Sequence, residues 1–521
     1  MANLEMKSFQ SSSPQELDGH KSSNELDGAY LARLGKKPVL KRNFGTLAVL
    51  GFSTTILITW EGIIVLFLQP LQNGGPAGAV WGFLFVWIGT ACVFTVLAEL
   101  ASMAPTSGGQ YHWVSMLAPP SMSKFLSYIT GASLIRSLII LTQPSYVPQS
   151  WHVTLLFWAL TAFAVGINAV GRTVLPKLEG MILVVHALGF FGALIALVSL
   201  ADTTSAKMVF TEWVNEGGWS TQGLSFFVGI VGCVFAFAGG DAAIHIAEEV
   251  QNAPVVVPRA ILFSVLINGA LGFGMTIALL FCLGNLKEAL RSPTGFPAMY
   301  IFAHGTGSKS GTATIFAIII VVGACSITGL MAASSRQFWS FSRDKGIPGW
   351  RLWSKVTTTT AIPIWAVVFS TVVPALLALI PIGSSVAFNQ LVAMSITGAY
   401  LSYMVVGILL LWRRLTGSVL PRYQVSPDET VNTTGAKLVW GPFHVPGIWG
   451  VLVNAFGIIY GLIASFFSMW PTHTPVGVET MNFSVVGTFG TILLAIAYYV
   501  IRARHEYRGP IIETTGYGHA L

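Results

Sequence analysis

Long runs of apolar residues recur along the chain between about residue 44 and residue 502. A run of about 17 to 25 such residues is long enough for a helix to cross the hydrocarbon core of a membrane. Only 9% of the 521 residues are charged, and this is too few to cover the surface of a soluble fold. The sequence therefore predicts an all-α polytopic membrane protein, and it excludes soluble, secreted and fibrous classes.

Twelve of these runs are predicted to be membrane spans. They lie near residues 44–68, 77–104, 123–141, 151–168, 177–200, 224–246, 259–283, 312–335, 361–380, 385–411, 446–470 and 483–502. The third is the weakest, because it is short and contains Arg136. We expect a disordered tail at residues 1–43, a twelve-helix domain at 44–502 and a second tail at 503–521.

The positions of Lys and Arg predict the orientation. With twelve spans and a cytoplasmic N-terminus, the inner segments hold 23 of these residues and the outer loops hold 4. If the third run does not cross, the count becomes 13 inside and 15 outside. Because Lys and Arg accumulate on the cytoplasmic side of membrane proteins, both tails are expected in the cytoplasm. The N-terminal tail has no apolar segment typical of a signal peptide.

Several function classes lack the motifs that they require. The short loops contain no glycine-rich nucleotide loop, no HExxH and no Ser-His-Asp set that water could reach. The basic residues are scattered, so they form no patch typical of nucleic-acid binding. The four cysteines lie inside apolar runs and predict neither disulfides nor a metal site. We expect no enzyme activity, no cofactor, no metal and no nucleic-acid partner, with membrane lipid around the spans.

Polar residues in the first span form one candidate site. Thr55, Thr59, Trp60 and Glu61 follow one another within a few residues, between glycines. A hydroxyl such as that of Thr55 either bonds to a helix or lines a site, and both interpretations remain open. A buried carboxylate must be neutralised or paired, and ionisable residues inside a span are usually functional. We therefore expect Glu61 to contribute to binding or coupling.

The sixth span contains a second interruption. Gly239 and Gly240 lie in mid-span, followed directly by Asp241. Glycine weakens a helix, and the backbone groups of a broken helix can bind the charged ends of a small solute. A close helix crossing, which needs only small residues, is the alternative. Because the first and sixth spans are both interrupted, we expect two broken helices at the substrate site.

A histidine in the fifth span completes the candidate residues. His186 lies in an apolar run and is either a proton carrier or a hydrogen-bonded core residue. Together with Glu61 and Asp241, it provides titratable groups in mid-membrane. No set of sodium ligands is evident, so we expect coupling to protons, with sodium as the alternative.

Several segments resemble one family. The segment from Glu99 to Trp113 strongly resembles fungal amino acid/choline permeases of the amino acid-polyamine-organocation superfamily. Residues 235–249 and 340–348 are similar to the sixth span of that superfamily and to the loop after its eighth span. Residues 73–76 and 143–146 fit the fungal branch. The resemblance extends from about residue 40 to residue 505.

The resemblance implies an inverted repeat of five plus five helices of the leucine-transporter type, with two further helices at the C-terminus. Thr59, Trp60 and Glu61 would lie in the unwound part of the first helix, and Phe235 would be the aromatic gate. Gly239, Gly240 and Asp241 would form the sixth-helix break. His186 would lie near the fifth-helix lysine that replaces sodium in some proton-coupled relatives.

The chain departs from the family pattern in its third span. After Tyr128 the family continues with a longer helix, whereas here Ala132 to Arg136 leads almost directly to Gln143 and Pro144. About twenty residues, roughly one helix, are missing by comparison with the family. A shortened gene model or a true deletion would explain this difference, and both put the activity of the chain in question.

Together these features predict a secondary active permease in a membrane, expected to be the plasma membrane although an internal membrane is an alternative. Its substrates would be amino acids, gamma-aminobutyrate, choline or related small amines, moved by alternating access around helices 1 and 6. A transporter-like nutrient sensor and an exporter of a small nitrogenous metabolite are the alternatives. An intramembrane enzyme is disfavoured, because no paired catalytic residues are evident.

Overall fold

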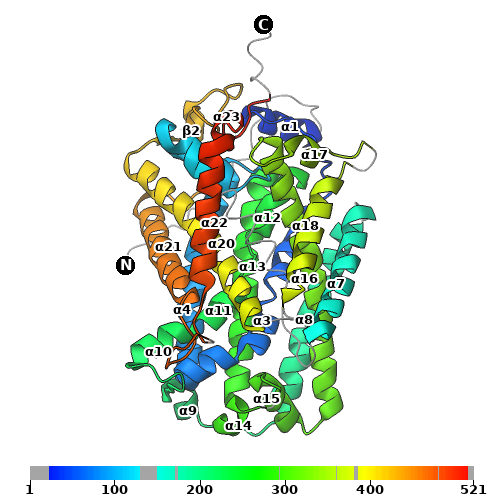
Figure 1. The fold of residues 1–521 in the computed structure, drawn as a ribbon, viewed down its shortest axis with the longest axis vertical. Coiled ribbons are helices and arrows are strands. Elements are labelled where there is room, and N and C mark those ends of the chain that lie inside the picture. The colour runs from blue at the N-terminus through cyan, green and yellow to red at the C-terminus, as the bar shows by residue number, and fades with distance from the viewer. Residues whose placement is uncertain are drawn as a thin grey trace, which may run out of the picture.

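The structure is a computed structural model that describes residues 23–128, 150–170, 174–292, 294–358, 361–380, 385–478 and 480–513. Within these ranges the chain forms an elongated bundle of helices that lie side by side (Figure 1). Two short strands, β1 (Val419–Leu420) and β2 (Leu438–Val439), pair in parallel in a loop. Lipid offers no hydrogen-bond partners to backbone N–H and C=O groups, whereas a helix pairs these groups within itself. An apolar chain of this kind therefore folds as helices.

Eight helical stretches in the described residues are long and apolar enough to cross a membrane. They are Thr46–Leu66 (α2, Thr46–Leu57, and α3, Thr59–Leu66), α4 (Leu68–Met103), α8 (Val174–Leu200), α13 (Ala253–Phe281), α16 (Lys309–Arg343), Ala393–Leu415 in α20 (Ser385–Leu415), α21 (Gly447–Ser468) and Ser484–Glu506 (α22, Ser484–Tyr498; η3, Tyr499–Ala503; α23, Arg504–Glu506). The prediction of a multi-pass membrane protein is confirmed.

Shorter apolar helices occupy the fourth, sixth and ninth predicted spans. They belong to α7 (Ser150–Val170), to α10 (Gln222–Gly229) with α11 (Val231–Ala236), and to α18 (Ile364–Leu377). Most of the third predicted span, with the departure from the family pattern, lies outside the described residues, which stop at 128 and resume at 150. The count of twelve spans and the five-plus-five repeat stay predictions.

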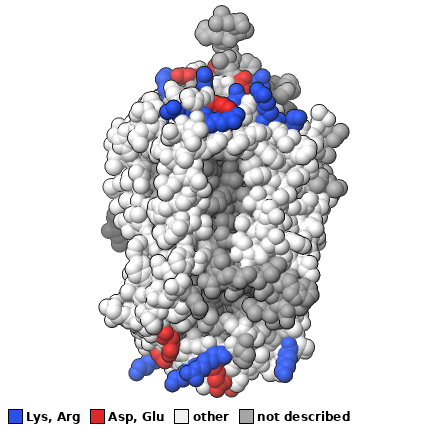
Figure 2. All heavy atoms as spheres, viewed as in Figure 1, with Lys and Arg blue, Asp and Glu red and all other residues white. Residues whose placement is uncertain are grey.

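Charge is confined to the ends of the bundle on the face that Figure 2 shows. One end is formed by α1 (Ser23–Arg33), α17 (Trp350–Trp353), α23 and the two strands, and we call it the basic end. The opposite end is formed by α9 (Ala206–Thr211), α14 (Leu286–Leu290) and α15 (Pro297–Thr306). Between them, Leu188 and Ile195 of α8 are exposed by 67% and 62%. Such apolar exposure suits contact with lipid.

Both described chain ends are tied to the basic end by ion pairs. Lys36 Nζ lies 2.6 Å from Asp344 Oδ1, and Arg343 Nη1 lies 3.2 Å from Glu248 Oε2. Arg343 also pairs with Glu513. Burial raises the pKa of Glu513, but the hydrogen bonds and positive charge of Arg343 outweigh this effect and hold the pKa below its ordinary value. Glu513 is therefore charged at neutral pH.

The orientation can be tested by labelling single cysteines. Lys287 at the opposite end is exposed, and Tyr423 at the basic end is 85% exposed. If the basic end faces the cytoplasm, Lys287→Cys will react with a membrane-impermeant maleimide on intact cells, and Tyr423→Cys only after permeabilisation. Three of the native cysteines are buried, so the wild-type chain is the background control. Labelling of Tyr423→Cys on intact cells would contradict the predicted topology.

Candidate functional site

The first span is interrupted at Ile58, between α2 and α3. Ile58 has φ 36° and ψ 46°, a left-handed conformation that a β-branched residue rarely adopts. Asn268 of α13 bonds to both sides of the interruption, because its Nδ2 donates to Thr54 O at 3.0 Å and its Oδ1 accepts from Thr59 N at 3.1 Å. The backbone groups freed by the break are thus partly satisfied within the protein.

The sixth span is interrupted between α11 and α12 (Ala242–His245), after which η1 (Ala247–Glu249) follows. Gly239 in the intervening turn has φ +87°, which favours glycine. A Cβ added at Gly240 would lie 2.1 Å from Phe94 Cε2 and 3.0 Å from Leu57 Cδ2. Gly240 therefore allows α4 and the end of α2 to approach the turn. Phe235 is half-buried in α11.

The two interruptions lie side by side. Gly240 faces Leu57, the last residue of α2. One turn beyond the first break, a Cβ added at Gly62 would lie 3.3 Å from the Ala236 Cα. Two stretches of irregular backbone that are distant in sequence thus meet at one place. Irregular backbone inside a membrane protein is tolerated where it is buried in protein or lines a cavity.

A carboxylate and a histidine meet beside the first break. Glu61 Oε1 lies 2.7 Å from His186 Nδ1, and Trp60 Nε1 donates to the same nitrogen at 3.2 Å. Glu61 is 1% exposed, and His186 and Trp60 are fully buried. Glu61 Oε2 and His186 Nε2 have no hydrogen-bond partner among the described residues. The structure therefore brings together three of the residues that the sequence indicated.

The geometry of this pair accommodates one proton. A hydrogen bond between Glu61 Oε1 and His186 Nδ1 needs a proton between the two atoms. If the proton is on His186 Nδ1, that nitrogen cannot accept a hydrogen bond from Trp60. If the proton is on Glu61, the carboxyl O–H and the Trp60 indole N–H compete for the one lone pair of Nδ1. A carboxyl and an imidazole at this distance can pass a proton directly between them.

Thr55 does not join that pair. Its Oγ1 lies 2.6 Å from Glu179 Oε2 on α8, and it also donates to Gly51 O at 2.9 Å. Glu179 is fully buried, and no hydrogen bond to its Oε1 occurs in the part of the chain that the structure describes. No ion pair to Glu179 occurs among the described residues. A second buried carboxyl therefore contacts α2, the first half of the interrupted first span. We call this span, α2 together with α3, helix 1.

Asp241 also lies apart from the Glu61 pair. Its Oδ2 accepts from Gln110 Nε2 at 3.0 Å and lies 3.6 Å from His245 Nε2. Gln110 begins α5 (Gln110–Leu117), within the segment that resembles the fungal permeases. Tyr403 of α20 is within interaction range of the same carboxylate. Asp241 therefore links the sixth-span break to α5 and α20 in this conformation.

Sequence reasoning missed three residues of these groups: Glu179, Asn268 and Gln110. Glu179 and Asn268 had a visible signal, because each is a polar residue inside an apolar run. Gln110 had no such signal, since it lies outside the predicted spans and its partner Asp241 is 131 positions away.

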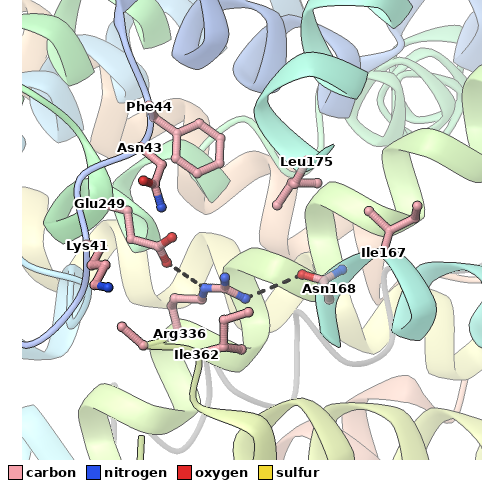
Figure 3. Close-up of a pocket in the computed structure, with 10 residues that line it drawn as sticks. Lys41, Asn43, Phe44, Ile167, Asn168, Leu175, Glu249, Arg336 and Ile362 are labelled. Carbon is pink, nitrogen blue, oxygen red and sulfur yellow. Dashed lines mark hydrogen bonds and ion pairs between the residues drawn. The ribbon is translucent and has the colours of Figure 1, made fainter. Parts of the chain in front are cut away.

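A pocket lies at the basic end (Figure 3). It is lined by Lys41 and Phe44 before α2, Asn168 of α7, Glu249 of η1 and Arg336 of α16, among others. The Arg336 Nε lies 2.7 Å from Glu249 Oε1, and its Nη1 donates to Asn168 Oδ1 at 3.4 Å. These contacts connect the inner ends of α7, η1 and α16 across the pocket.

We expect Glu61→Gln to separate transport from folding. The amide can still donate to His186 Nδ1, so surface abundance should stay close to wild type, but the side chain can no longer carry the proton. Uptake driven by a pH gradient should fall by about tenfold or more. Surface biotinylation and uptake on the same cells measure both quantities. The matched control is Glu288→Gln, which alters an exposed carboxyl at the opposite end. Unchanged gradient dependence in Glu61→Gln would contradict a proton role.

The role of Gly240 can be tested by adding a Cβ at this position and then making room for it at Phe94. Gly240→Ala should displace the Phe94 ring and lower surface abundance, with overpacking costing about 1 to 3 kcal/mol. Adding Phe94→Leu should restore abundance. If the freed backbone binds substrate, uptake per surface molecule will stay low in the double variant. Full recovery of uptake would show that Gly240 serves packing alone.

Comparison with known proteins places the chain in a family. The profile of the family described as amino acid permease matches residues 44–491. The chain is 28% identical to a choline transporter of Saccharomyces cerevisiae, over 90% of this chain and 83% of the relative. It is 28% identical to a putative amino acid/polyamine transporter of Macrophomina phaseolina, over 85% and 98%. It is 27% identical to amino-acid permease 2 of Neurospora crassa, over 95% and 91%. The chain belongs to the amino acid permease family.

Proposed function

We propose that this membrane transporter is a secondary active uptake carrier for a small nitrogenous solute. The candidate substrates are amino acids, gamma-aminobutyrate, choline and related amines, in line with the names of the similar proteins. The observation that carries the proposal is the adjacency of the two breaks, at Ile58 and at residues 237–241. Freed backbone groups and the carboxyl of Glu61 provide complementary partners for a solute with a charged amine.

Proton coupling is the second part of the proposal. Glu61 Oε1 and His186 Nδ1 lie 2.7 Å apart, close enough to exchange a proton, next to the break where the solute would bind. A cationic amine that approaches Glu61 favours its charged form and thereby changes the proton occupancy of the pair. Substrate and proton then influence each other's binding reciprocally. Asp241, which bonds to Gln110, would respond to movement of the sixth-span break.

Alternating access would open the basic end to the cytoplasm. In this conformation the site is sealed, since Thr59, Trp60, Glu61, His186 and Asp241 are at most 2% exposed. The ion pair between Arg336 and Glu249 crosses the pocket at the basic end. An inward-open state would require this pair to separate and become hydrated. We place the carrier in the plasma membrane, with both tails in the cytoplasm.

Uptake by cells that lack related permeases tests the function. Radiolabelled choline, gamma-aminobutyrate, arginine and leucine would each be offered, with polyamines as competitors. We expect saturable uptake of at least one solute, loss of uptake when a protonophore collapses the pH gradient, and no effect when potassium replaces sodium. Sodium-dependent uptake would contradict proton coupling. Solute binding without uptake would favour a sensor, and release from preloaded cells alone would favour an exporter.

A further inference from the structure

One face of α13 packs along helix 1 on both sides of its break. Ser264, Asn268 and Gly272 lie four residues apart, so they share one side of the helix. Ser264 Oγ lies 2.8 Å from Ser53 Oγ, before the break. A Cβ added at Gly272 would lie 2.7 Å from Thr59 Cγ2, after the break. This face, which we call the α13 stripe, therefore contacts both halves of helix 1.

Asn268 occupies the middle of the α13 stripe, opposite Ile58. Its amide nitrogen bonds to Thr54 O in α2, and its amide oxygen bonds to Thr59 N, the first residue of α3. The side chain is fully buried. An asparagine amide combines one donor group with one acceptor in a fixed plane, which matches one free carbonyl and one free N–H. No hydroxyl of the α13 stripe bonds to both halves in the described structure.

The Thr59 contact sets the position of the coupling residues. Thr59 immediately precedes Trp60 and Glu61, and all three lie in the first turn of α3. A helix start held at its N–H has a defined rotation, and this rotation directs Glu61 toward His186. Without that contact the Thr59 N–H would be buried without a hydrogen-bond acceptor, which destabilises this position. We expect the first turn of α3 to shift until the Thr59 N–H finds another acceptor.

We infer that Asn268 is a positioning residue that joins the two halves of helix 1 and sets the Glu61–His186 geometry. It does not touch the substrate or the proton. It holds the break in one arrangement, so that the carboxyl and the imidazole remain at proton-sharing distance. This inference rests on the proposed function, and it adds a residue that was not among the candidates chosen from the sequence or the family resemblance.

The chain contains a matched control for this residue. Asn454 of α21 is also fully buried. With its amide group turned so that both atoms are satisfied, its nitrogen donates to Gly407 O at 3.0 Å and its oxygen accepts from Leu411 N at 3.2 Å, both on α20. It makes the same two kinds of backbone bond on another helix, away from the breaks. If the loss of such an asparagine merely destabilises the fold, substitutions of Asn268 and of Asn454 should therefore have the same effect.

The first experiment compares Asn268→Leu with Asn454→Leu. The probe is whichever of radiolabelled choline, gamma-aminobutyrate, arginine and leucine the wild-type chain takes up. Both variants should lose surface abundance to a similar extent. Maximal uptake per surface molecule should fall by about tenfold or more for Asn268→Leu only. Equal uptake per molecule in the two variants would overturn the inference. Absence of uptake by the wild-type chain would instead overturn the proposed function.

The second experiment uses a conservative change. In Asn268→Asp, the protonated carboxyl can donate to Thr54 O and accept from Thr59 N, whereas the ionised form can only accept. Exchange of the probe would be measured in vesicles with the same pH on both sides, as a ratio to wild type at each pH. The ratio should rise as the pH falls, while the ratio for Asn454→Asp stays flat. A flat ratio for Asn268→Asp would contradict the positioning role.

Discussion

Every part of the site depends on which groups form hydrogen bonds with the backbone where helix 1 is interrupted at Ile58. In lipid a free N–H or C=O has no water to bond to, so an interruption persists only if side chains or other backbone supply partners. Asn268 supplies one of each across Ile58. The left-handed Ile58 is strained, and the packing of α13 along both halves holds it. The orientation of Trp60 and Glu61 follows from this support.

Charge is distributed in two different ways in the molecule. At the basic end, Lys36, Arg336 and Arg343 form ion pairs with acidic residues, so that each of these buried charges has a partner of opposite sign. At the breaks, the Glu61 and His186 side chains are buried and lie 2.7 Å apart, without contact with water. We propose that opening the basic end would hydrate that pair and so link proton exchange to helix movement.

Much of the fold could be predicted from the sequence, because lipid imposes length and apolarity on each span separately. The runs near residues 177–200, 259–283 and 312–335 correspond to α8, α13 and α16. The position of the sixth-span break could also be predicted, since Gly239 and Gly240 mark it locally. Thr59, Trp60 and Glu61 were expected in the unwound part of the first span, but the break lies at Ile58 and these three residues form the first turn of α3. The reason is that Asn268 binds the Thr59 N–H, so the helix starts again there. Contacts were less predictable: Asp241 was expected to face a substrate, and in this conformation it bonds to Gln110. Pairings between distant residues leave no local pattern.

The sequence by itself determined the class of the protein and the set of intramembrane polar residues, because each residue's cost in lipid depends on its own chemistry. Only the tertiary structure decided which of them meet. Glu61 and His186 are 125 positions apart, Thr55 and Glu179 are 124, and Asn268 and Thr59 are 209. Helix packing sets these distances, through side-chain shape and close approach at glycines such as Gly240 and Gly272. Hydropathy carries no information about such pairs, so the proton-sharing geometry emerges only when the helices are assembled.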